Sequence, residues 1–251
     1  MSTLPRTGEA VIIGVTSRTG RETARRLLRE GWNLALTARR SEDASEVADS
    51  LLAEPDAVGA VTGVAAVDLC DEGTIDSFLS NRGEKGVLDL LVVAGAPFKE
   101  QSIDSWTMND FKEQAAAQAA GPALLAAGLK DELARSTRPG GATVVLFGDV
   151  HARLRPRAGA TPYLLGKASL ESLVPILAID LAPTRVFGIS PGVIAWADSF
   201  EQSRRDRYLE RVPLGRAGTV EEAADLVMAL AEAATYTTGI VIPIDGGRHL
   251  R

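Results

Sequence analysis

The segment Ala10-Val11-Ile12-Ile13-Gly14-Val15-Thr16-Ser17-Arg18-Thr19-Gly20 predicts the fold of this 251-residue chain. Its apolar first half is typical of a buried strand, and the amphipathic residues 21–30 predict a helix that ends at Gly31. Glycines in the turn between them let backbone amides approach a ligand, and the helix N-terminus favours negative charge. The turn therefore indicates a phosphate site, although an ordinary strand-to-helix turn has the same order. The candidate phosphate-binding residues are Gly14, Thr16, Ser17, Arg18, Thr19 and Gly20.

Beyond this segment, short apolar runs alternate with helical stretches. The runs that predict strands are residues 33–37, 61–67, 88–94, 143–147, 184–190 and 240–244. Helical patterns cover residues 42–53, 71–81, 107–135, 164–181 and 220–233, with kinks expected at Gly121-Pro122 and at Pro175. This alternation predicts an α/β fold: a single Rossmann-type, doubly wound parallel sheet of about seven strands with helices on both faces. We find no repeat or linker, so residues 1–251 are expected to form one domain.

Two arginines follow the second predicted strand, where dinucleotide folds meet the adenosine ribose. An acidic residue at this position binds the free 2′-hydroxyl of NAD, whereas an arginine accommodates the 2′-phosphate of NADP. The chain has Arg39, Arg40 and Ser41 here, with no acidic residue before Glu42. The strand tip therefore favours NADP(H), and the alternative is a solvated basic turn.

Other candidate residues also follow predicted strands. The carboxyl ends of parallel strands meet at one edge of the sheet, where ligands bind in such folds. The glycine turn, Arg40, Asp68, Gly95, Asp149 and Pro191 all occupy such ends. This convergence predicts a nucleotide site at that edge.

Tyr163 and Lys167 are four residues apart at the start of the fourth long helical pattern. Residues at this spacing share one face of a helix and can touch. A free phenol titrates near ~10, and a fixed positive charge beside it favours the phenolate and lowers its pKa. A tyrosine tuned in this way can protonate a carbonyl oxygen as a hydride reaches the carbon. The same spacing also occurs in ordinary surface pairs, so the pair gains meaning from the predicted nucleotide site.

The overall composition argues against several other classes of protein. The chain is 45% hydrophobic and 24% charged, with a net charge of −6 and a pI of about 5.1. This balance gives no reason to bind nucleic acid or an anionic membrane, and no apolar run approaches the ~20 residues that span a bilayer. One cysteine and two histidines make neither a disulfide nor a conventional zinc site. With a short polar stretch at residues 1–9, we expect a soluble cytoplasmic protein without a metal.

Together these residues resemble the short-chain dehydrogenase/reductase family over nearly the whole chain. The matching pieces, in order, are the turn from Gly14 to Gly20, Asp68, Ala94-Gly95, the Tyr163 to Lys167 spacing, Pro191-Gly192 and Asp245-Gly246-Gly247. The resemblance implies that Tyr163 donates the proton and that Lys167 lowers its pKa and holds the nicotinamide ribose. It further implies an adenine contact by Asp68 and Leu69, a ribose contact along Ala94 and Gly95, a nicotinamide border at Pro191, Gly192 and Val193, and a substrate lid at residues 195–216.

The glycine turn departs from the usual family pattern, Thr-Gly-x3-Gly-x-Gly. Ile13 replaces the threonine and Arg18 replaces the middle glycine. A Gly-x3-Arg-x-Gly turn resembles the pteridine-reductase branch, including bacterial dihydromonapterin and dihydrofolate reductases. In that branch the arginine reaches the cofactor phosphates and the substrate, and Arg40-Ser41 resembles its NADPH-binding pair.

The usual catalytic serine, thirteen residues before the tyrosine, is missing. That position is Val150, and residues 137–168 contain no serine. Pteridine reductases carry an aspartate instead, so a one-residue insertion would align Asp149 with it and let Asp149 relay a proton near Tyr163. The alternative is a strand-end aspartate that caps its own loop. His151 is a second candidate for the same place.

Further differences count against a pterin enzyme. The usual Asn-Asn-Ala-Gly is Val92-Val93-Ala94-Gly95, and the asparagine that supports the proton relay becomes Gln118. The pterin-stacking aromatic falls at Pro97, with Phe98 next to it, and Trp196 is another candidate for the pocket. We take Pro97, Phe98 and Trp196 as candidate substrate contacts, with ordinary core packing as the alternative for the aromatic residues.

Three functional hypotheses follow. The first is an NADPH-dependent oxidoreductase that transfers hydride to a C=O or C=N carbon of a small pterin-like or carbonyl substrate, with Tyr163, Lys167 and Asp149 as catalytic residues. The second is a ketone or quinone reductase of secondary metabolism. The third is an NADP-binding sensor or scaffold without turnover, which the lost serine and asparagine permit and the intact Tyr163/Lys167 pair opposes. The resemblance implies a homotetramer, while the sequence leaves the substrate and the direction of reaction open.

Overall fold

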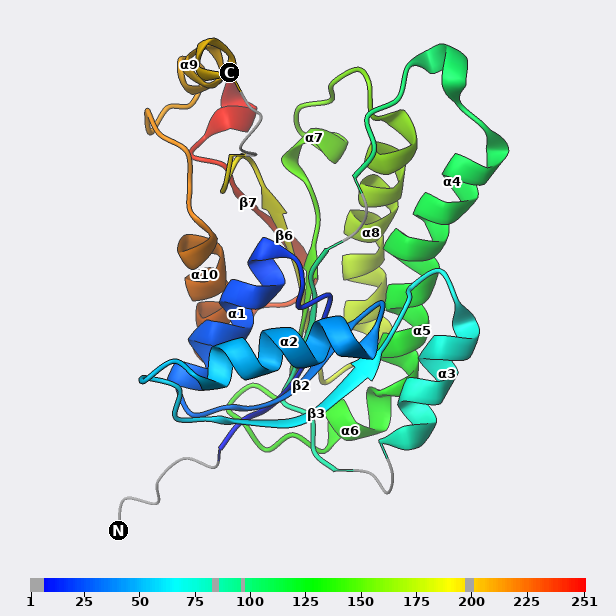
Figure 1. The fold of residues 1–251 in the computed structure, drawn as a ribbon, viewed down its shortest axis with the longest axis vertical. Coiled ribbons are helices and arrows are strands. Elements are labelled where there is room, and N and C mark those ends of the chain that lie inside the picture. The colour runs from blue at the N-terminus through cyan, green and yellow to red at the C-terminus, as the bar shows by residue number, and fades with distance from the viewer. Residues whose placement is uncertain (1–6, 83–85, 96–97, 197–200) are drawn as a thin grey trace.

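A sheet of seven parallel strands forms the centre of the molecule (Figure 1). The structure is a computed structural model that describes residues 7–82, 86–95, 98–196 and 201–251. The strands are β1 (Glu9–Ile13), β2 (Asn33–Ala38), β3 (Ala60–Ala66), β4 (Leu90–Val93), β5 (Thr143–Phe147), β6 (Arg185–Pro191) and β7 (Ile240–Ile244). Their spatial order is β3-β2-β1-β4-β5-β6-β7, and every neighbouring pair is parallel. The predicted doubly wound sheet is confirmed.

The strand order reverses between β1 and β4. From β1 the chain moves outward to β3, then crosses back to β4 and continues outward to β7. The loops that leave β1 and β4 therefore diverge, which opens a crevice at the carboxyl ends of these two strands. Gly14 and Ala94, which follow β1 and β4, lie at this crevice.

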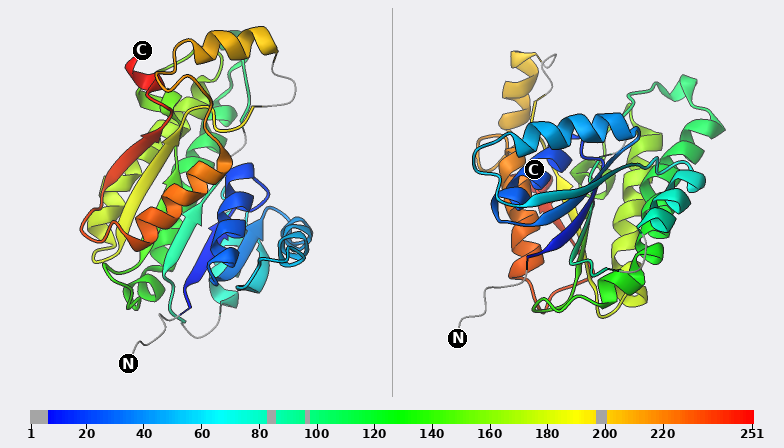
Figure 2. Two further views of the ribbon diagram at one scale, coloured as in Figure 1. Left: turned by 90° about the vertical axis from the view of Figure 1, so that its left-hand side faces the viewer. Right: turned by 60° about the horizontal axis from the view of Figure 1, so that its bottom comes forward.

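Helices cover both faces of the sheet, as the two further views in Figure 2 show. One face carries α1 (Arg18–Arg29), α2 (Ser41–Leu52) and α10 (Val220–Glu232), and the other carries α3 (Glu72–Asn81), α4 (Met108–Ala115), α5 (Gly121–Gly128), α6 (Lys130–Ala134) and α8 (Thr161–Asp180). Strand β1 shows how the sequence divides the core. Ile12 packs in the cluster beneath α1, α2 and α10, whereas Val11 and Ile13 pack in the cluster on the opposite face. Side chains alternate along a strand, so a strand covered on both faces is apolar throughout.

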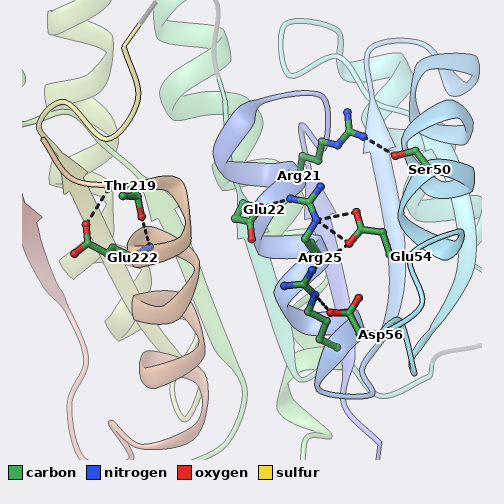
Figure 3. A network of polar contacts seen from close by, with 9 residues as sticks. Arg21, Glu22, Arg25, Ser50, Glu54, Asp56, Thr219 and Glu222 are labelled. Carbon is green, nitrogen blue, oxygen red and sulfur yellow. Dashed lines mark hydrogen bonds and ion pairs between the residues drawn. The ribbon is translucent and has the colours of Figure 1, made fainter.

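Polar contacts hold the first layer of helices together at its surface (Figure 3). Arg25 on α1 donates to both carboxylate oxygens of Glu54, just beyond α2, at 2.9 and 3.0 Å. On α10, Thr219 and Glu222 form a capping box in which each side chain accepts the backbone N–H of the other. The Arg25–Glu54 pair helps to fix α1, whose N-terminus faces the crevice, and the capping box stabilises the start of α10.

The long predicted helix is broken into four segments. The helix α4 runs into a π-helical turn, η2 (Ala116–Ala120), before α5 begins at Gly121, and a further break at Leu129 separates α6. The kink therefore falls at the turn that precedes Gly121-Pro122. Pro122 has no N–H to donate to the carbonyl four residues earlier, which accounts for irregular backbone at this point.

Two other helices differ from expectation. The helix α8 continues through Pro175 without a break, because buried Val174 and Leu177 hold its flanks against the sheet. The helix α9 (Gln202–Leu209) lies in a stretch expected to be irregular. It has no buried residue and hence no apolar stripe by which the sequence would reveal it.

Among the described residues, α8 is the one helix long and apolar enough to cross a membrane, with a mean hydropathy of 1.2 over its apolar window. It packs against β6 and η2 and buries two ionisable side chains, Lys167 and Glu171. These features are typical of a core helix. Three short helical segments complete the described elements: α7 (Val150–Arg153), η1 (Ile103–Ser105) and η3 (Arg248–Leu250).

Candidate active site

A hollow of about 540 Å³ opens at the crevice between β1 and β4. Eight of the cofactor-binding candidates line it together: Gly14, Thr16, Ser17, Arg39, Asp68, Leu69, Ala94 and Gly95. The rest of its wall is Ile13, Val67, Cys70, Glu113 and Ala117, and no sequence pattern marked the last three. The hollow lies beside the N-terminus of α1, where backbone amides and the helix dipole favour a phosphate. These residues fit the adenosine and phosphate portions of a dinucleotide.

Glycine is required twice in the turn that leads into α1. Gly14 has φ +83°, and a Cβ there would lie 2.0 Å from the carbonyl oxygen of Ala94. A Cβ at Gly20 would lie 2.4 Å from the carbonyl oxygen of Gly14. Ser17 caps the helix by accepting the Gly20 N–H at 3.0 Å, with the Thr19 hydroxyl 3.4 Å away. The turn thus brings the start of α1 against the end of β4, which larger residues would prevent.

Arg39 lines the hollow, whereas Arg40 does not. The Arg40 guanidinium pairs with Asp43 in the first turn of α2, with Nε 2.9 Å from Oδ2. The Ser41 hydroxyl lies 3.2 Å from a carboxylate oxygen of Glu42 in the same turn. The structure thus places Arg39, and not Arg40, in the wall of the hollow, and the expectation that Arg40 and Ser41 form the 2′-phosphate pair stays a prediction. Acidic side chains gather at the N-terminus of a helix, and here they engage both residues.

Tyr163 and Asp149 meet at the carboxyl end of β5. Asp149 caps α7, because its Oδ1 accepts the His151 N–H at 2.8 Å. Its Oδ2 accepts the Tyr163 hydroxyl at 3.1 Å. The Asp149 carboxylate therefore caps its own loop with one oxygen and contacts Tyr163 with the other, so the two interpretations of this residue are compatible. Val150 is fully buried, and the His151 ring contacts the Arg155 carbonyl at 2.7 Å.

Lys167 lies one turn further along α8 and is buried. Its Nζ donates to the Phe147 carbonyl at 2.5 Å and lies 5.9 Å from the centre of the Tyr163 ring. Burial lowers the pKa of Lys167 to about 8, against the opposing charges of Asp149 and Glu171.

The phenol of Tyr163 does not become more acidic in this structure. Burial raises the pKa of Tyr163 well above its usual value, and the charge of Asp149 and its hydrogen bond raise it further. The expectation that Lys167 lowers this pKa is therefore wrong here, since desolvation and a neighbouring carboxylate both disfavour the phenolate. Tyr163 is a neutral hydrogen-bond donor at neutral pH.

Phe98 packs against the same tyrosine. Its ring meets Tyr163 edge to face with centroids 5.1 Å apart, and the Arg157 guanidinium lies 5.1 Å from the Phe98 centroid. Phe98 remains 51% exposed, so it has surface left for a ligand. Pro97, the other candidate at this position, lies outside the described residues.

The start of the predicted lid is tied to the glycine turn. Arg18 Nη1 donates to the Trp196 carbonyl at 2.9 Å, so Arg18 binds this segment and does not line the hollow. The Trp196 ring lies edge to face with Tyr208 of α9 at 5.5 Å. The Tyr208 oxygen accepts the Val193 N–H at 3.2 Å. The segment therefore packs beside residues 191–193, where the family resemblance places the nicotinamide, and Tyr208 is a contact that the sequence did not reveal.

Gln118 occupies the π-helical turn η2 beside α8. Its amide is buried, 3.5 Å from that of Gln114, and a Cβ at Gly166 would lie 2.9 Å from its Cγ. Gly166 precedes Lys167, so the amide that replaces the usual asparagine adjoins the helix that carries Tyr163 and Lys167. Such π-helical turns are frequent at functional sites.

Comparison with known proteins agrees with this fold and site. Residues 14–249 match the family model described as Enoyl-(Acyl carrier protein) reductase. The chain belongs to the short-chain dehydrogenase/reductase family, and it is therefore an enzyme of the oxidoreductase class.

Individual relatives share part or all of the chain. It is 29% identical to L-xylulose reductase of Bos taurus over 95% of each chain. It is 40% identical to Protein FixR of Bradyrhizobium diazoefficiens over 132 residues, which are 51% of this chain and 46% of that protein, so this match spans less than half of FixR. The solved Pseudomonas aeruginosa RhlG/NADP active-site complex superposes with a TM-score of 0.84 at 26% identity, covering 96% of each chain.

Proposed function

We propose that this protein is an NADP(H)-dependent carbonyl reductase in which Tyr163 delivers the proton. The observation that carries the proposal is the joint position of Tyr163, Asp149 and Lys167 at the carboxyl ends of the strands, next to a hollow that fits the adenosine and phosphate portions of a dinucleotide. The NADP-bound structural relative supports the choice of cofactor, and the relative named for reduction of L-xylulose supports a carbonyl substrate.

Each residue of the site has a distinct task in this mechanism. When bound, the nicotinamide supplies the hydride. Tyr163 holds its proton at neutral pH and gives it to the substrate oxygen, because its raised pKa keeps the phenol neutral until charge develops on that oxygen. In the resting site Asp149 accepts the Tyr163 hydroxyl and so orients it. After the transfer, solvent water returns a proton to the phenolate, and the Asp149 charge favours this return because it disfavours the phenolate. Lys167, while charged, is the buried cation that offsets the transient phenolate.

The substrate class is carbonyl in this proposal, with pterin as the second candidate. The pterin candidate rests on the Gly-x3-Arg-x-Gly turn, yet Arg18 of that turn is engaged by Trp196. The experiment is NADPH oxidation with the purified protein across ketones, keto esters, quinones and a dihydropterin. We expect turnover of at least one carbonyl compound. Turnover of the pterin alone would make a pterin, and not a carbonyl compound, the substrate class. Tight NADPH binding without oxidation in the presence of any compound would favour a sensor or scaffold.

Arg39 is expected to select NADP(H) over NAD(H). A guanidinium makes paired hydrogen bonds to a phosphate, and losing such charge-assisted bonds weakens affinity by about 10- to 100-fold. Arg39→Met should therefore raise the Kd of NADPH by about that factor and leave the Kd of NADH within about twofold, as measured by titration calorimetry. Arg40→Met is the matched control, because Asp43 engages Arg40, and it should change neither Kd more than about threefold. Equal losses for both cofactors in Arg39→Met would contradict the assignment.

We also propose that the chain forms a homo-oligomer through the outer side of α8. Leu165, Ile176 and Ile179 on this helix are 56%, 54% and 78% exposed, although its opposite side is buried. Exposed apolar groups that gather on one side of a helix mark an interaction surface. Light scattering after gel filtration should give about four times the chain mass of 26.5 kDa. Ile179→Arg should yield a smaller species, and a monomeric wild-type protein would contradict the proposal.

A further inference from the structure

A buried carboxylate lies beneath the proposed catalytic residues without a part in the mechanism. Glu171 is on α8, one turn beyond Lys167, and is 3% exposed. A carboxylate in such a place is costly to desolvate, so its contacts need a physical explanation. Burial raises the pKa of Glu171, and hydrogen bonds from Ser190 and from the backbone of Asp149 oppose that rise.

The contacts of Glu171 converge on the turn that carries Asp149. Its Oε1 accepts the Ser190 hydroxyl in a short hydrogen bond from β6, and lies 3.4 Å from the backbone nitrogen of Asp149. A Cβ at Gly148 would lie 2.7 Å from Glu171 Oε1 and 2.7 Å from Ser190 Oγ, so the turn closes directly over the carboxylate. Glu171 therefore connects β6, α8 and the residue that holds the Tyr163 hydroxyl.

The same carboxylate acts on Lys167 along the helix. Residues four apart share a helix face, and the Glu171 charge favours the protonated form of Lys167 against the effect of burial. The charged and titratable groups around the pair are Tyr163 on α8, Asp149 after β5, and Arg153 on α7, whose Nε lies 3.9 Å from Glu171 Oε2. The helix segments α4 and η2 add the uncharged amides of Gln114 and Gln118, and β6 adds the Ser190 hydroxyl.

We propose that Glu171 is a positioning residue of this site: it holds the turn that points Asp149 at Tyr163, and it keeps the Lys167 ammonium charged. The inference rests on the proposed function for its catalytic meaning. The electrostatic coupling between Glu171 and Lys167 does not depend on catalysis, so it can be measured without any turnover.

The test is a pH titration of lysine side chains by nuclear magnetic resonance. The chain has only five lysines, so labelling their ε-carbons gives few signals, and the signal that disappears in Lys167→Arg assigns Lys167. Wild-type Lys167 should titrate near a pKa of about 8. Glu171→Gln keeps the size of the side chain and removes its charge, so the Lys167 midpoint should move lower by at least about 0.5 pH unit.

Two further variants keep the outcome decisive. Ser190→Ala removes a hydrogen bond that favours the charged carboxylate, so it should move the Lys167 midpoint in the same direction by less, and it serves if Glu171→Gln fails to fold. Glu132→Gln is the matched control. Glu132 is a buried glutamate on α6 whose carboxylate lies 2.6 Å from the Arg82 guanidinium. Removing its charge should leave the Lys167 midpoint unchanged. Unchanged midpoints in both site variants would overturn the proposal.

The dependence of kcat on pH is a second measurement of the same coupling. In Glu171→Gln, the alkaline fall of kcat should begin at lower pH, in step with the Lys167 midpoint. A loss of thermal stability with an unshifted pH profile would mean that Glu171 only packs, and would overturn its role at the site. Absence of turnover in the wild type would refute the proposed function and leave the titration result standing.

Discussion

Replacing Tyr163 with phenylalanine should lower kcat by about 10²- to 10⁴-fold, the range that a positioned general acid contributes. The ring would keep its edge-to-face contact with Phe98, while the hydroxyl that donates to Asp149 would be gone. The fold should persist, since one hydrogen bond of this kind contributes about 1 kcal/mol. NADPH affinity should change by less than about threefold, because the charges that bind phosphate are untouched. Steady-state kinetics and calorimetric titration together measure both quantities.

The control for this variant is Tyr236→Phe. Tyr236 is fully exposed and lies away from the described site, so its hydroxyl has no catalytic task. It should retain wild-type kcat and Kd. If Tyr163→Phe also retained near-wild-type turnover, the proton would have another source and the mechanism would be wrong.

Replacing Asp149 with asparagine should lower kcat by about 10- to 100-fold. Asparagine caps helices about as well as aspartate, so α7 should keep its start while the negative charge beside Tyr163 is lost. If Asp149 served only as a cap, this variant would turn over substrate at the wild-type rate. A matched control is Asp71→Asn, which makes the same exchange at the cap of α3, where Asp71 accepts the Gly73 N–H at 2.9 Å.

The Asp149 variant should also change the dependence of kcat on pH. The Lys167 ammonium has a pKa lowered to about 8, and Asp149 is one of two charges that keep it from falling further. A lysine with a lowered pKa is charged below that pH and neutral above it. In Asp149→Asn the alkaline fall of kcat should therefore begin at lower pH than in the wild type. An unshifted profile would mean that Lys167 ionisation does not govern the rate.

The sheet was predictable because its signal is local. The central strands β1, β4, β5 and β6 are buried on both faces, so each appears as a continuous apolar run, and residues 143–147 match β5 to the residue. The edge strand β7 is only partly buried, yet residues 240–244 also match it to the residue. The break in the long helix was foreseen from Gly121-Pro122, although its π-helical form was not. The helix α9 had no local signal, since all its side chains face outward or lie only partly buried.

The positions of the candidate residues were predictable, and their contacts less so. Topology alone requires that residues after parallel strands converge, which explains why Gly14, Asp68 and Gly95 line one hollow and why Asp149 lies at the same edge of the sheet. Which of two adjacent arginines faces the hollow depends on Asp43, and the sign of the Tyr163 pKa shift depends on burial. The spacing of residues in the sequence predicts neither the arginine that faces the hollow nor the direction of the pKa shift, because each depends on contacts that form only on folding.

The most direct test of the central claim is a crystal structure of the protein with NADP and an unreactive carbonyl ligand. The account predicts the Tyr163 hydroxyl within hydrogen-bond distance of the ligand's carbonyl oxygen, with Asp149 on its other side and the nicotinamide ring against the carbonyl carbon. A nicotinamide ring bound away from Tyr163, or a Tyr163 hydroxyl pointing out of the crevice, would contradict it.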